Sequence, residues 1–182
     1  MAETVPANSP FMVILSGPPA AGKDTIARRV CRHFPKTLAE INLDKIKGFV
    51  ESDPRTDVFL DLASDLAQSM ARIYLNACLS VFIHNAFCKY DFVRPFISLA
   101  DELRVPVWYF KLTAPVDELV RRNRARSNPV KESDIRRIYA LDQASTHAEG
   151  TVIDTMKCGI DQAATLILQT VFARSDASRA DG

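Results

Sequence analysis

The residues that could most clearly carry out chemistry form a glycine-bounded segment near the N-terminus. Its spacing, GxxxxGK, is typical of phosphate-binding loops. Gly17 and Gly22 permit backbone torsions that close a loop around an anion, so that successive N–H groups point inward. The Lys23 ammonium would reach the outer phosphates as a point charge. The candidate nucleotide-binding residues are Gly17, Pro18, Pro19, Ala20, Ala21, Gly22, Lys23, Asp24 and Thr25.

The sequence on both sides of this segment supports the same interpretation. The apolar run 11–16 predicts a strand, and residues 22–34 predict a helix because Ile26, Val30 and Phe34 recur every four positions. A strand, this loop and a helix are the context that a P-loop requires, and the helix dipole adds partial positive charge at the loop. The competing interpretation is an ordinary strand-to-helix turn with a solvated lysine.

The residue after the lysine departs from the usual P-loop pattern. Asp24 stands where a Ser or Thr hydroxyl usually contacts magnesium. Its carboxylate could bind Mg²⁺ directly or through water, because hard cations favour oxygen ligands. It could instead favour the first helical turn by charge–dipole attraction. Both roles stay open at this point, and Asp24 is the candidate metal ligand.

A second candidate group follows the predicted strand 38–42. A carboxylate at Asp44 could face an acceptor hydroxyl while phosphates lie on the P-loop, orient that hydroxyl and take its proton. Lys47 lies on the same face if a helix begins there, and could hold an anionic part of the acceptor. The alternative is that Asp44 caps a helix and the nearby lysines are solvated.

A third candidate group is the arginine-rich segment 121–137, which has seven Arg and Lys residues against two acidic ones. Arg122 and Arg126 are four positions apart and share a helix face. Cations of this kind stabilise the oxygens of a transferring phosphoryl group, and the loop 127–130 would then belong to a short lid that closes over a nucleotide. The alternative is a solvated basic helix or a nucleic-acid patch, which also fits Arg121 and Arg124.

Predicted strands and helices alternate along the chain. The strands are expected at 11–16, 38–42, 79–83, 105–112 and 151–153, and the helices at 22–34, 56–77, 90–104, 115–126, 133–144 and 160–173. The helix at 56–77 rests on the spacing of Val58, Leu62, Leu66, Met70, Ile73 and Ala77. Alternation of this kind predicts an α/β fold with a five-stranded parallel sheet and helices on both faces. Ligands in such sheets bind at the carboxyl ends of the strands.

Length and composition bound the remaining possibilities. The 182 residues fit one domain, which we place at 11–174, with a flexible arm at 1–10 and a disordered tail at 175–182. A net charge of +1 gives no global electrostatic reason to expect nucleic-acid or membrane binding. The four cysteines are scattered without a CxxC pair, which argues against zinc and for a reducing compartment. With no secretory signal and no apolar run long enough to span a bilayer, a cytoplasmic protein is expected.

Taken in order, these motifs resemble the P-loop kinases related to the kinase domain of polynucleotide kinase, with zeta-toxin-type kinases as relatives. The resemblance covers about residues 11–172 and includes GxxxxGK, the Asn42-x-Asp44-x-x-Lys47 segment, LVRRNRAR at 119–126 and DIRRIY at 134–139. It implies a three-layer P-loop kinase fold with a short arginine-rich lid. It also implies roles for single residues: Lys23 binds phosphates, Asp44 is the base, Lys47 replaces an acceptor-side arginine, Arg122 and Arg126 belong to the lid, and Asp154-Thr155 borders the adenine.

One segment departs from the pattern of these kinases. They usually carry an Asp after the third strand, where this chain has His84-Asn85. Asn85 accepts hydrogen bonds but carries no charge. We interpret His84 as a satisfied polar residue at a strand end, the alternative being a group that titrates near neutrality. Asp24 could restore the missing carboxylate from another direction.

The sequence therefore predicts an ATP- and Mg²⁺-dependent phosphotransferase. Its catalytic residues would be Lys23, Asp44, Arg122 and Arg126, and Asp44 and Lys47 would bind the acceptor. That acceptor is a small sugar- or nucleoside-type molecule or a 5′-hydroxyl polynucleotide, so nucleic acid is a possible partner and not a required one. A nucleotide-binding regulatory or switch protein with weak hydrolysis is the alternative, supported by the changes at Asp24 and His84-Asn85. A nucleic-acid adaptor is a third hypothesis.

Overall fold

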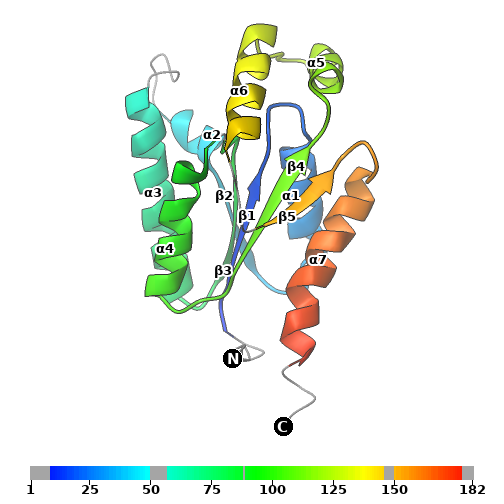
Figure 1. Cartoon of the computed structure of the whole chain (residues 1–182). Helices are drawn as coiled ribbons and strands as arrows, with labels where there is room; N and C mark the ends of the chain where they lie inside the picture. Colours follow the sequence, from blue (N-terminus) through cyan, green and yellow to red (C-terminus); the bar gives the residue numbers. More distant parts are fainter. Residues whose placement is uncertain (1–8, 50–56, 88, 146–149, 178–182) are drawn as a thin grey trace.

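The computed structural model describes residues 9–49, 57–87, 89–145 and 150–177. Its centre is a parallel five-stranded sheet with the strand order β2-β3-β1-β4-β5. The strands are β1 (Met12–Ser16), β2 (Leu38–Asn42), β3 (Ser80–His84), β4 (Val107–Thr113) and β5 (Thr151–Asp154). Helices cover both faces (Figure 1), so the predicted α/β fold and its sheet are confirmed.

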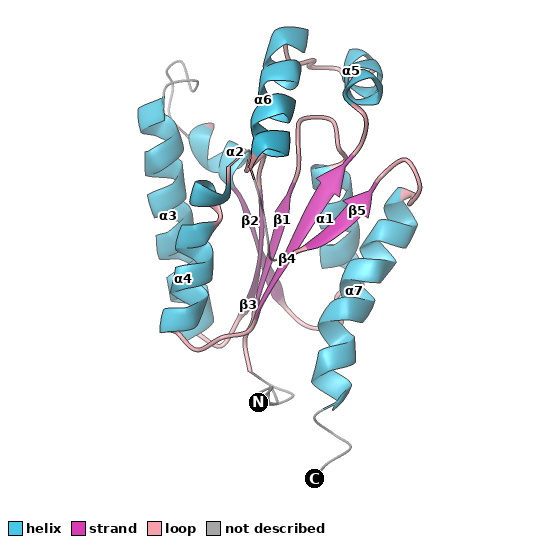
Figure 2. Ribbon diagram, viewed as in Figure 1, coloured by secondary structure: helices cyan, strands magenta, loops and turns pink. Residues whose placement is uncertain are grey.

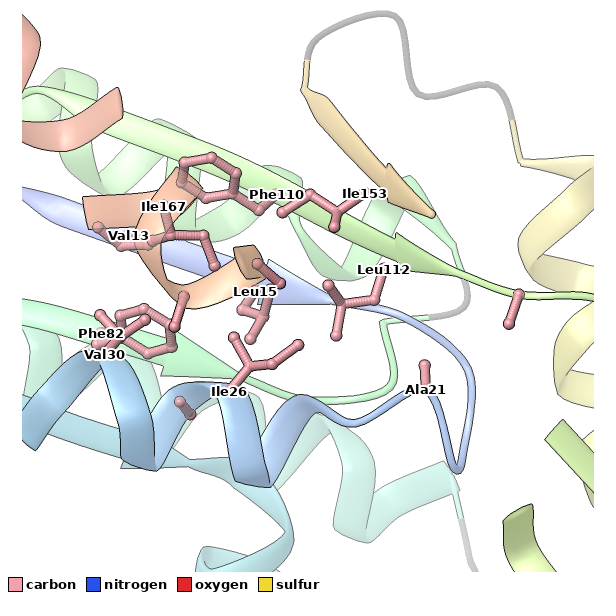
Figure 3. Close-up of a cluster of buried hydrophobic side chains, with 14 of the residues drawn as sticks. Val13, Leu15, Ala21, Ile26, Val30, Phe82, Phe110, Leu112, Ile153 and Ile167 are labelled. Atoms are coloured by element: carbon pink, nitrogen blue, oxygen red, sulfur yellow. The ribbon is translucent and has the colours of Figure 1, made fainter. Parts of the chain in front are cut away.

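One face of the sheet packs against α1 (Lys23–His33) and α7 (Ile160–Ala177), as Figure 2 shows. β1 is buried along its whole length, because it lies between β3 and β4 and has helices on both sides. Leu15 of β1, Ile26 of α1 and Ile167 of α7 meet in this core (Figure 3). The start of α1, and with it the P-loop, is therefore fixed to the centre of the sheet.

The opposite face packs against α2 (Leu43–Lys47), α3 (Asp57–Asn76) and α4 (Arg94–Glu102), with a 3₁₀ turn at Tyr90–Phe92 before α4. Helix α3 forms where expected, but most of the side chains that predicted it point outward. Leu62, Leu66 and Ile73 are 45%, 46% and 66% exposed. Small residues on a neighbouring line of the helix let it approach the sheet closely. The buried residues of α3 are Ala63, Ala67, Ala71 and Leu75.

Helices α5 (Val116–Arg124) and α6 (Glu132–Ala144) lie beyond the carboxyl ends of β1 and β4 (Figure 1). The chain passes from β1 to β2 on one side of the sheet and from β3 to β4 on the other side of β1. Where connections diverge in this way, a crevice opens at the carboxyl edge of the strands. The fold thus places the P-loop, the residues after β2 and the arginine-rich segment at one end of the sheet.

Differences from the expected boundaries are small. The last helix continues to Ala177, four residues beyond the end that its sequence pattern predicted. The expected arm at 1–10 and tail at 175–182 otherwise fall largely on residues 1–8 and 178–182, outside the described residues. In the described part of the chain, no helix has the length and apolar character needed to cross a membrane.

Candidate functional site

The P-loop owes its shape to its two glycines. Gly17 has φ +149°, and a Cβ there would lie 2.8 Å from the Leu112 carbonyl oxygen of β4. Gly22, at φ +97°, is left-handed and directly precedes α1. Ala20 is also left-handed, at φ 65°, a strained conformation for a residue with a Cβ. The loop is therefore held in one form by its contact with β4, with the first N–H groups of α1 at its end.

Lys23 lies inside this loop. Its Nζ donates hydrogen bonds to the carbonyl oxygens of Gly17 at 2.9 Å and Pro18 at 3.0 Å, and one of its three N–H donors is left for a ligand. Burial is the main reason that the pKa of Lys23 is lowered to about 8, and the nearby Arg126 guanidinium adds to this effect. A buried ammonium under a loop of backbone amides is suited to bind phosphate, because it gains a counter-charge on binding.

A cavity of about 1200 Å³ opens above the loop. Its walls come from the P-loop and α1, from α2, from the segment after β3, and from both sides of the α5–α6 connection. Most of the predicted site residues line this cavity, but Gly17, Pro18 and Ala21 of the P-loop do not. The predicted residues that line it are Pro19, Ala20, Gly22, Lys23, Asp24, Thr25, Asp44, Lys47, Arg122 and Arg126.

Helix α2 presents the candidate acceptor residues. Its N-cap is Asn42, whose side-chain oxygen accepts hydrogen bonds from the backbone N–H of Asp44 at 2.9 Å and of Lys45 at 3.3 Å. The alternative in which Asp44 serves as the cap is therefore wrong. The side chain of Asp44 is free to reach the cavity, where Lys47 Nζ contacts its Oδ1 at 3.1 Å. Lys47 itself is largely buried, so it is no ordinary solvated lysine.

The two lid arginines differ sharply. Arg122 is bound on three sides: Nε donates to Glu118 at 2.7 Å, Nη1 to the Thr155 hydroxyl at 2.9 Å, and Nη2 to the Thr155 carbonyl at 3.1 Å. The guanidinium of Arg126 makes no hydrogen bond or ion pair with the residues that the structure describes. Arg122 thus joins α5 to the segment after β5, while Arg126 has its charge available to a ligand.

Most other charges of the arginine-rich segment are paired within it. Arg121 and Arg122 hold the pKa of Glu118 well below its ordinary value. Arg124 and Arg136 both contact Glu132, at 3.0 Å and 2.9 Å. Glu118 and Glu132 thus hold two arginines each in place, and the segment keeps a net positive charge.

Sequence reasoning missed the residue that holds the lid turn together. Asn123 is buried, and its side chain bonds both backbone groups of Val130: Nδ2 donates to the carbonyl at 2.7 Å, and Oδ1 accepts from the N–H at 3.0 Å. The connection between α5 and α6 is closed by this pair. An Asn among arginines carried no signal of this role, because its partner is a backbone seven residues away.

The candidate metal ligand Asp24 has an unexpected neighbour. His84 is 1% exposed at the end of β3, with Nδ1 at 3.5 Å from Asp24 Oδ1 and Nε2 at 2.9 Å from Glu40 Oε1. Asn85 lines the cavity, and its Oδ1 accepts the Ala86 N–H at 2.8 Å. His84 is therefore a satisfied residue at a strand end, as interpreted, but its partners are two carboxylates, one of which belongs to the P-loop helix.

The donor chemistry at Asp24 fits a magnesium ion that arrives with a nucleotide. Among the described residues, no group of three His, Cys, Asp or Glu side chains could hold a metal alone. Mg²⁺ in nucleotide sites instead uses one or two carboxylates together with phosphates and waters. Asp24 offers such a carboxylate at the edge of the cavity, beside Lys23.

Comparison with known proteins agrees with this geometry. A family model described as an AAA domain, AAA_33, matches residues 12–149. No curated protein matches the chain significantly.

Several solved structures are similar to it. The tunicamycin resistance protein of Deinococcus radiodurans has a TM-score of 0.64 at 20% identity, over 90% of this chain and 95% of that one. A sugar kinase from a Janibacter species reaches 0.69 at 18%, over 93% and 98%. A structure of the Pnkp1/Rnl/Hen1 RNA repair complex reaches 0.64 at 20%, over 76% of this chain and 45% of that one. At these identities the similarity shows the fold, which is that of the P-loop kinases.

Proposed function

Because the chain belongs to the AAA_33 family and has a P-loop kinase fold, we propose that it is an ATP-dependent phosphotransferase with a hydroxyl acceptor. The supporting observation is that one cavity brings together the Lys23 ammonium, the Asp44 carboxylate and the Arg126 guanidinium from three separate parts of the chain. A phosphate-binding cation, a base and a mobile cation are the groups that in-line phosphoryl transfer needs.

Each residue has a distinct task in this reaction. The P-loop amides and Lys23 bind the phosphates of ATP, and Asp44 orients the acceptor hydroxyl and takes its proton. The acceptor oxygen forms a bond to the γ-phosphorus as the bond to the oxygen that leaves with ADP breaks. Arg126 stabilises the charge on the oxygens in flight. Asp24 would hold the magnesium ion that binds with the nucleotide, and that ion would supply further positive charge at the phosphates.

Arg122 has a supporting place in this proposal. Three hydrogen bonds hold it to Glu118 and Thr155, so it positions α5 over the segment that we expect to border the adenine. From the sequence, Arg122 and Arg126 are both expected in the lid as catalytic residues. The contacts support a division of labour, with Arg126 in contact with the phosphates and Arg122 as the anchor.

A small hydroxyl compound is the favoured acceptor. Most arginines of α5 and α6 are held by ion pairs with carboxylates of the lid, so few are available to follow a nucleic-acid backbone. A similar structure is named a sugar kinase, which agrees with a small acceptor. A 5′-hydroxyl oligonucleotide remains the second candidate, since another similar structure belongs to an RNA repair complex.

A screen for transfer of labelled γ-phosphate tests the proposal. ATP and GTP are each offered with sugars, nucleosides and 5′-hydroxyl oligonucleotides. We expect a labelled small-molecule product, loss of transfer and of ATP binding in Lys23→Ala, and loss of transfer alone in Asp44→Asn. Asp65→Asn, an exposed carboxylate on α3, is the matched control and should behave as wild type.

The rival function gives a different result in the same screen. A nucleotide-binding switch protein would bind ATP tightly, hydrolyse it slowly and label none of the hydroxyl compounds. Normal turnover in Asp44→Asn would show that Asp44 is not the base.

A further inference from the structure

The buried imidazole of His84 takes no part in the proposed phosphoryl transfer, yet it lies directly behind the P-loop helix. It joins three elements, because His84 ends β3, Glu40 lies in β2 and Asp24 is in the first turn of α1. His84 Nε2 is 2.9 Å from Glu40 Oε1, and Nδ1 is 3.5 Å from Asp24 Oδ1. Of these three residues, only Asp24 lines the cavity.

We propose that Glu40 and His84 are positioning residues that hold the Asp24 carboxylate in the orientation needed to bind the metal of a metal–nucleotide complex. The inference rests on the proposed function. Asp24 replaces the short hydroxyl side chain usual at this position of a P-loop. Fixing this longer, partly exposed carboxylate in one rotamer for metal binding costs side-chain conformational entropy. His84 takes only Oδ1, so Oδ2 is left for a ligand.

The burial of the imidazole makes it suited to this task. At 1% exposure it cannot leave its place between β2 and α1, and it also packs edge-on against Phe82 at a ring separation of 6.2 Å. The bond to Glu40 fixes which way the ring faces. The imidazole, hydrogen-bonded to Glu40 at Nε2 and in longer contact with Asp24 at Nδ1, therefore links β2 to the carboxylate on α1.

Charge supports the same arrangement. The contact with His84 is the main reason that the pKa of Asp24 lies below its ordinary value, and burial acts in the opposite direction. An ionised Asp24 close to Lys23 would otherwise be drawn toward the ammonium, whose charge acts on it as well. The contact with His84 at the end of β3 gives the carboxylate an ion-pair partner within the sheet.

A purely structural role for His84 would give different results. In that case the imidazole joins β2 to α1 and its loss lowers thermal stability, while the metal affinity of the folded protein stays the same. A positioning role requires a change in metal affinity that passes through Asp24. Metal binding is therefore the deciding measurement, and turnover is not needed for it.

The experiment measures Mn²⁺ binding by electron paramagnetic resonance, with the full chain saturated by a non-hydrolysable ATP analogue. We expect His84→Gln to weaken Mn²⁺ binding roughly 10- to 100-fold, the range found when partners of metal ligands are removed. Glu40→Gln should weaken it by a smaller factor although Glu40 lies outside the cavity. His33→Gln, at the far end of α1, is the matched control and should bind Mn²⁺ as wild type does.

A double-mutant cycle shows whether the effect passes through Asp24. Asp24→Asn should weaken Mn²⁺ binding, and adding His84→Gln to it should cause no further loss, because nothing is left to position. Analogue binding in the presence of EDTA should be nearly equal in all variants. Equal further loss in the double variant, or wild-type Mn²⁺ affinity in His84→Gln despite a lower Tm, would overturn the inference.

The outcomes also separate this inference from the proposed function. If His84→Gln fails to fold, wild-type Mn²⁺ affinity in Glu40→Gln alone overturns the positioning chain. If wild-type protein binds the analogue and Mn²⁺ and the variants do so equally well, only the inference fails. If wild-type protein binds no analogue, the proposed function fails, and this inference fails with it.

Discussion

The floor of the cavity and the outer part of its lid differ in the side-chain contacts that stabilise them. The floor, residues 12–33, combines β1, the P-loop and the start of α1, and its side chains such as Leu15 and Ile26 are buried in the sheet core. The lid, residues 116–144, consists of α5, α6 and their connection. Its inner side chains Leu119, Val120 and Ile135 join the same core, whereas its outer side chains form exposed ion pairs, such as Arg124 with Glu132.

We expect this difference between buried apolar contacts and exposed ion pairs to decide which part of the cavity wall moves more easily. Exposed ion pairs contribute little to stability and are weakened by salt, whereas removal of a buried apolar side chain is costly. The lid is attached to the sheet where Leu119 and Ile135 enter the core and where Lys111 of β4 pairs with buried Asp142 of α6 at 3.1 Å. We therefore expect the connection between α5 and α6, rather than the whole lid, to move more readily than the floor.

The largest expected effect is a loss of turnover in a lid variant whose thermal stability is unchanged. Arg126→Ala should reduce turnover roughly 10²- to 10³-fold, as loss of one charge-stabilising donor typically does, with Tm unchanged because the guanidinium has no partner among the described residues. Steady-state kinetics and thermal melting measure the two effects. Arg124→Ala, which removes only a lid ion pair, is the control and should keep its turnover.

Normal turnover in Arg126→Ala would contradict the assigned role. Loss of turnover in both variants would indicate that turnover depends on the lid ion pairs, contrary to the small contribution expected of exposed pairs.

The next effect tests the rigidity of the floor. Gly17→Ala places a Cβ against the backbone of Leu112, and β4 has little freedom to retreat from it. We expect a loss of about 1–3 kcal/mol in the free energy of unfolding, together with weaker ATP binding. Urea unfolding and calorimetry measure both quantities.

Gly159→Ala is the matched control for this substitution, because a Cβ there would meet only Gln162 Oε1 at 3.9 Å. Equal stability of the two variants would show that the P-loop adapts easily and is not a fixed floor.

The floor was also the easier part to predict from sequence. A P-loop is local: its glycines, its lysine and the flanking strand and helix lie in one short stretch, so spacing alone placed Lys23 correctly. Helix α3 was predicted from Leu62, Leu66 and Ile73, which proved to be mostly exposed. Periodicity identifies a helix, but tertiary packing decides which face is buried.

Contacts between distant segments were beyond the reach of the sequence. His84 pairs with Glu40 across 44 positions, and Arg122 bonds Thr155 across 33. Neither pairing has a local pattern, since each depends on which strands become neighbours and how the lid lies over them. The residues to which we assign chemistry could therefore be proposed from the sequence, while their contacts with distant segments required the structure.

A smaller effect concerns the charge in the floor. Burial lowers the pKa of Lys23 to about 8, and phosphates bound beside it should raise that pKa. Below about pH 8 the ammonium is already charged and ATP binds without proton exchange at this residue. Above it, ATP binding must take up a proton, so affinity should fall up to about tenfold per pH unit.

Calorimetry at pH 9 in two buffers of different ionisation enthalpy measures this uptake. The same titration at pH 7 is the control and should show no uptake from Lys23. Equal affinity at pH 7 and pH 9 would show that the lysine is fully charged across this range before ATP binds.

The smallest expected effect concerns Asn123, which is buried in the lid. Asn123→Ala removes two hydrogen bonds to Val130, and we expect a local cost of about 1 kcal/mol. Amides of residues 124–131 should exchange faster with solvent while those of β1 do not, and KM should rise more than kcat falls, because closure is impaired and the floor is intact. Ser127→Ala, exposed in the same loop, is the control. Faster exchange that spreads into β1 would mean that floor and lid unfold as one unit, which would remove the distinction between them.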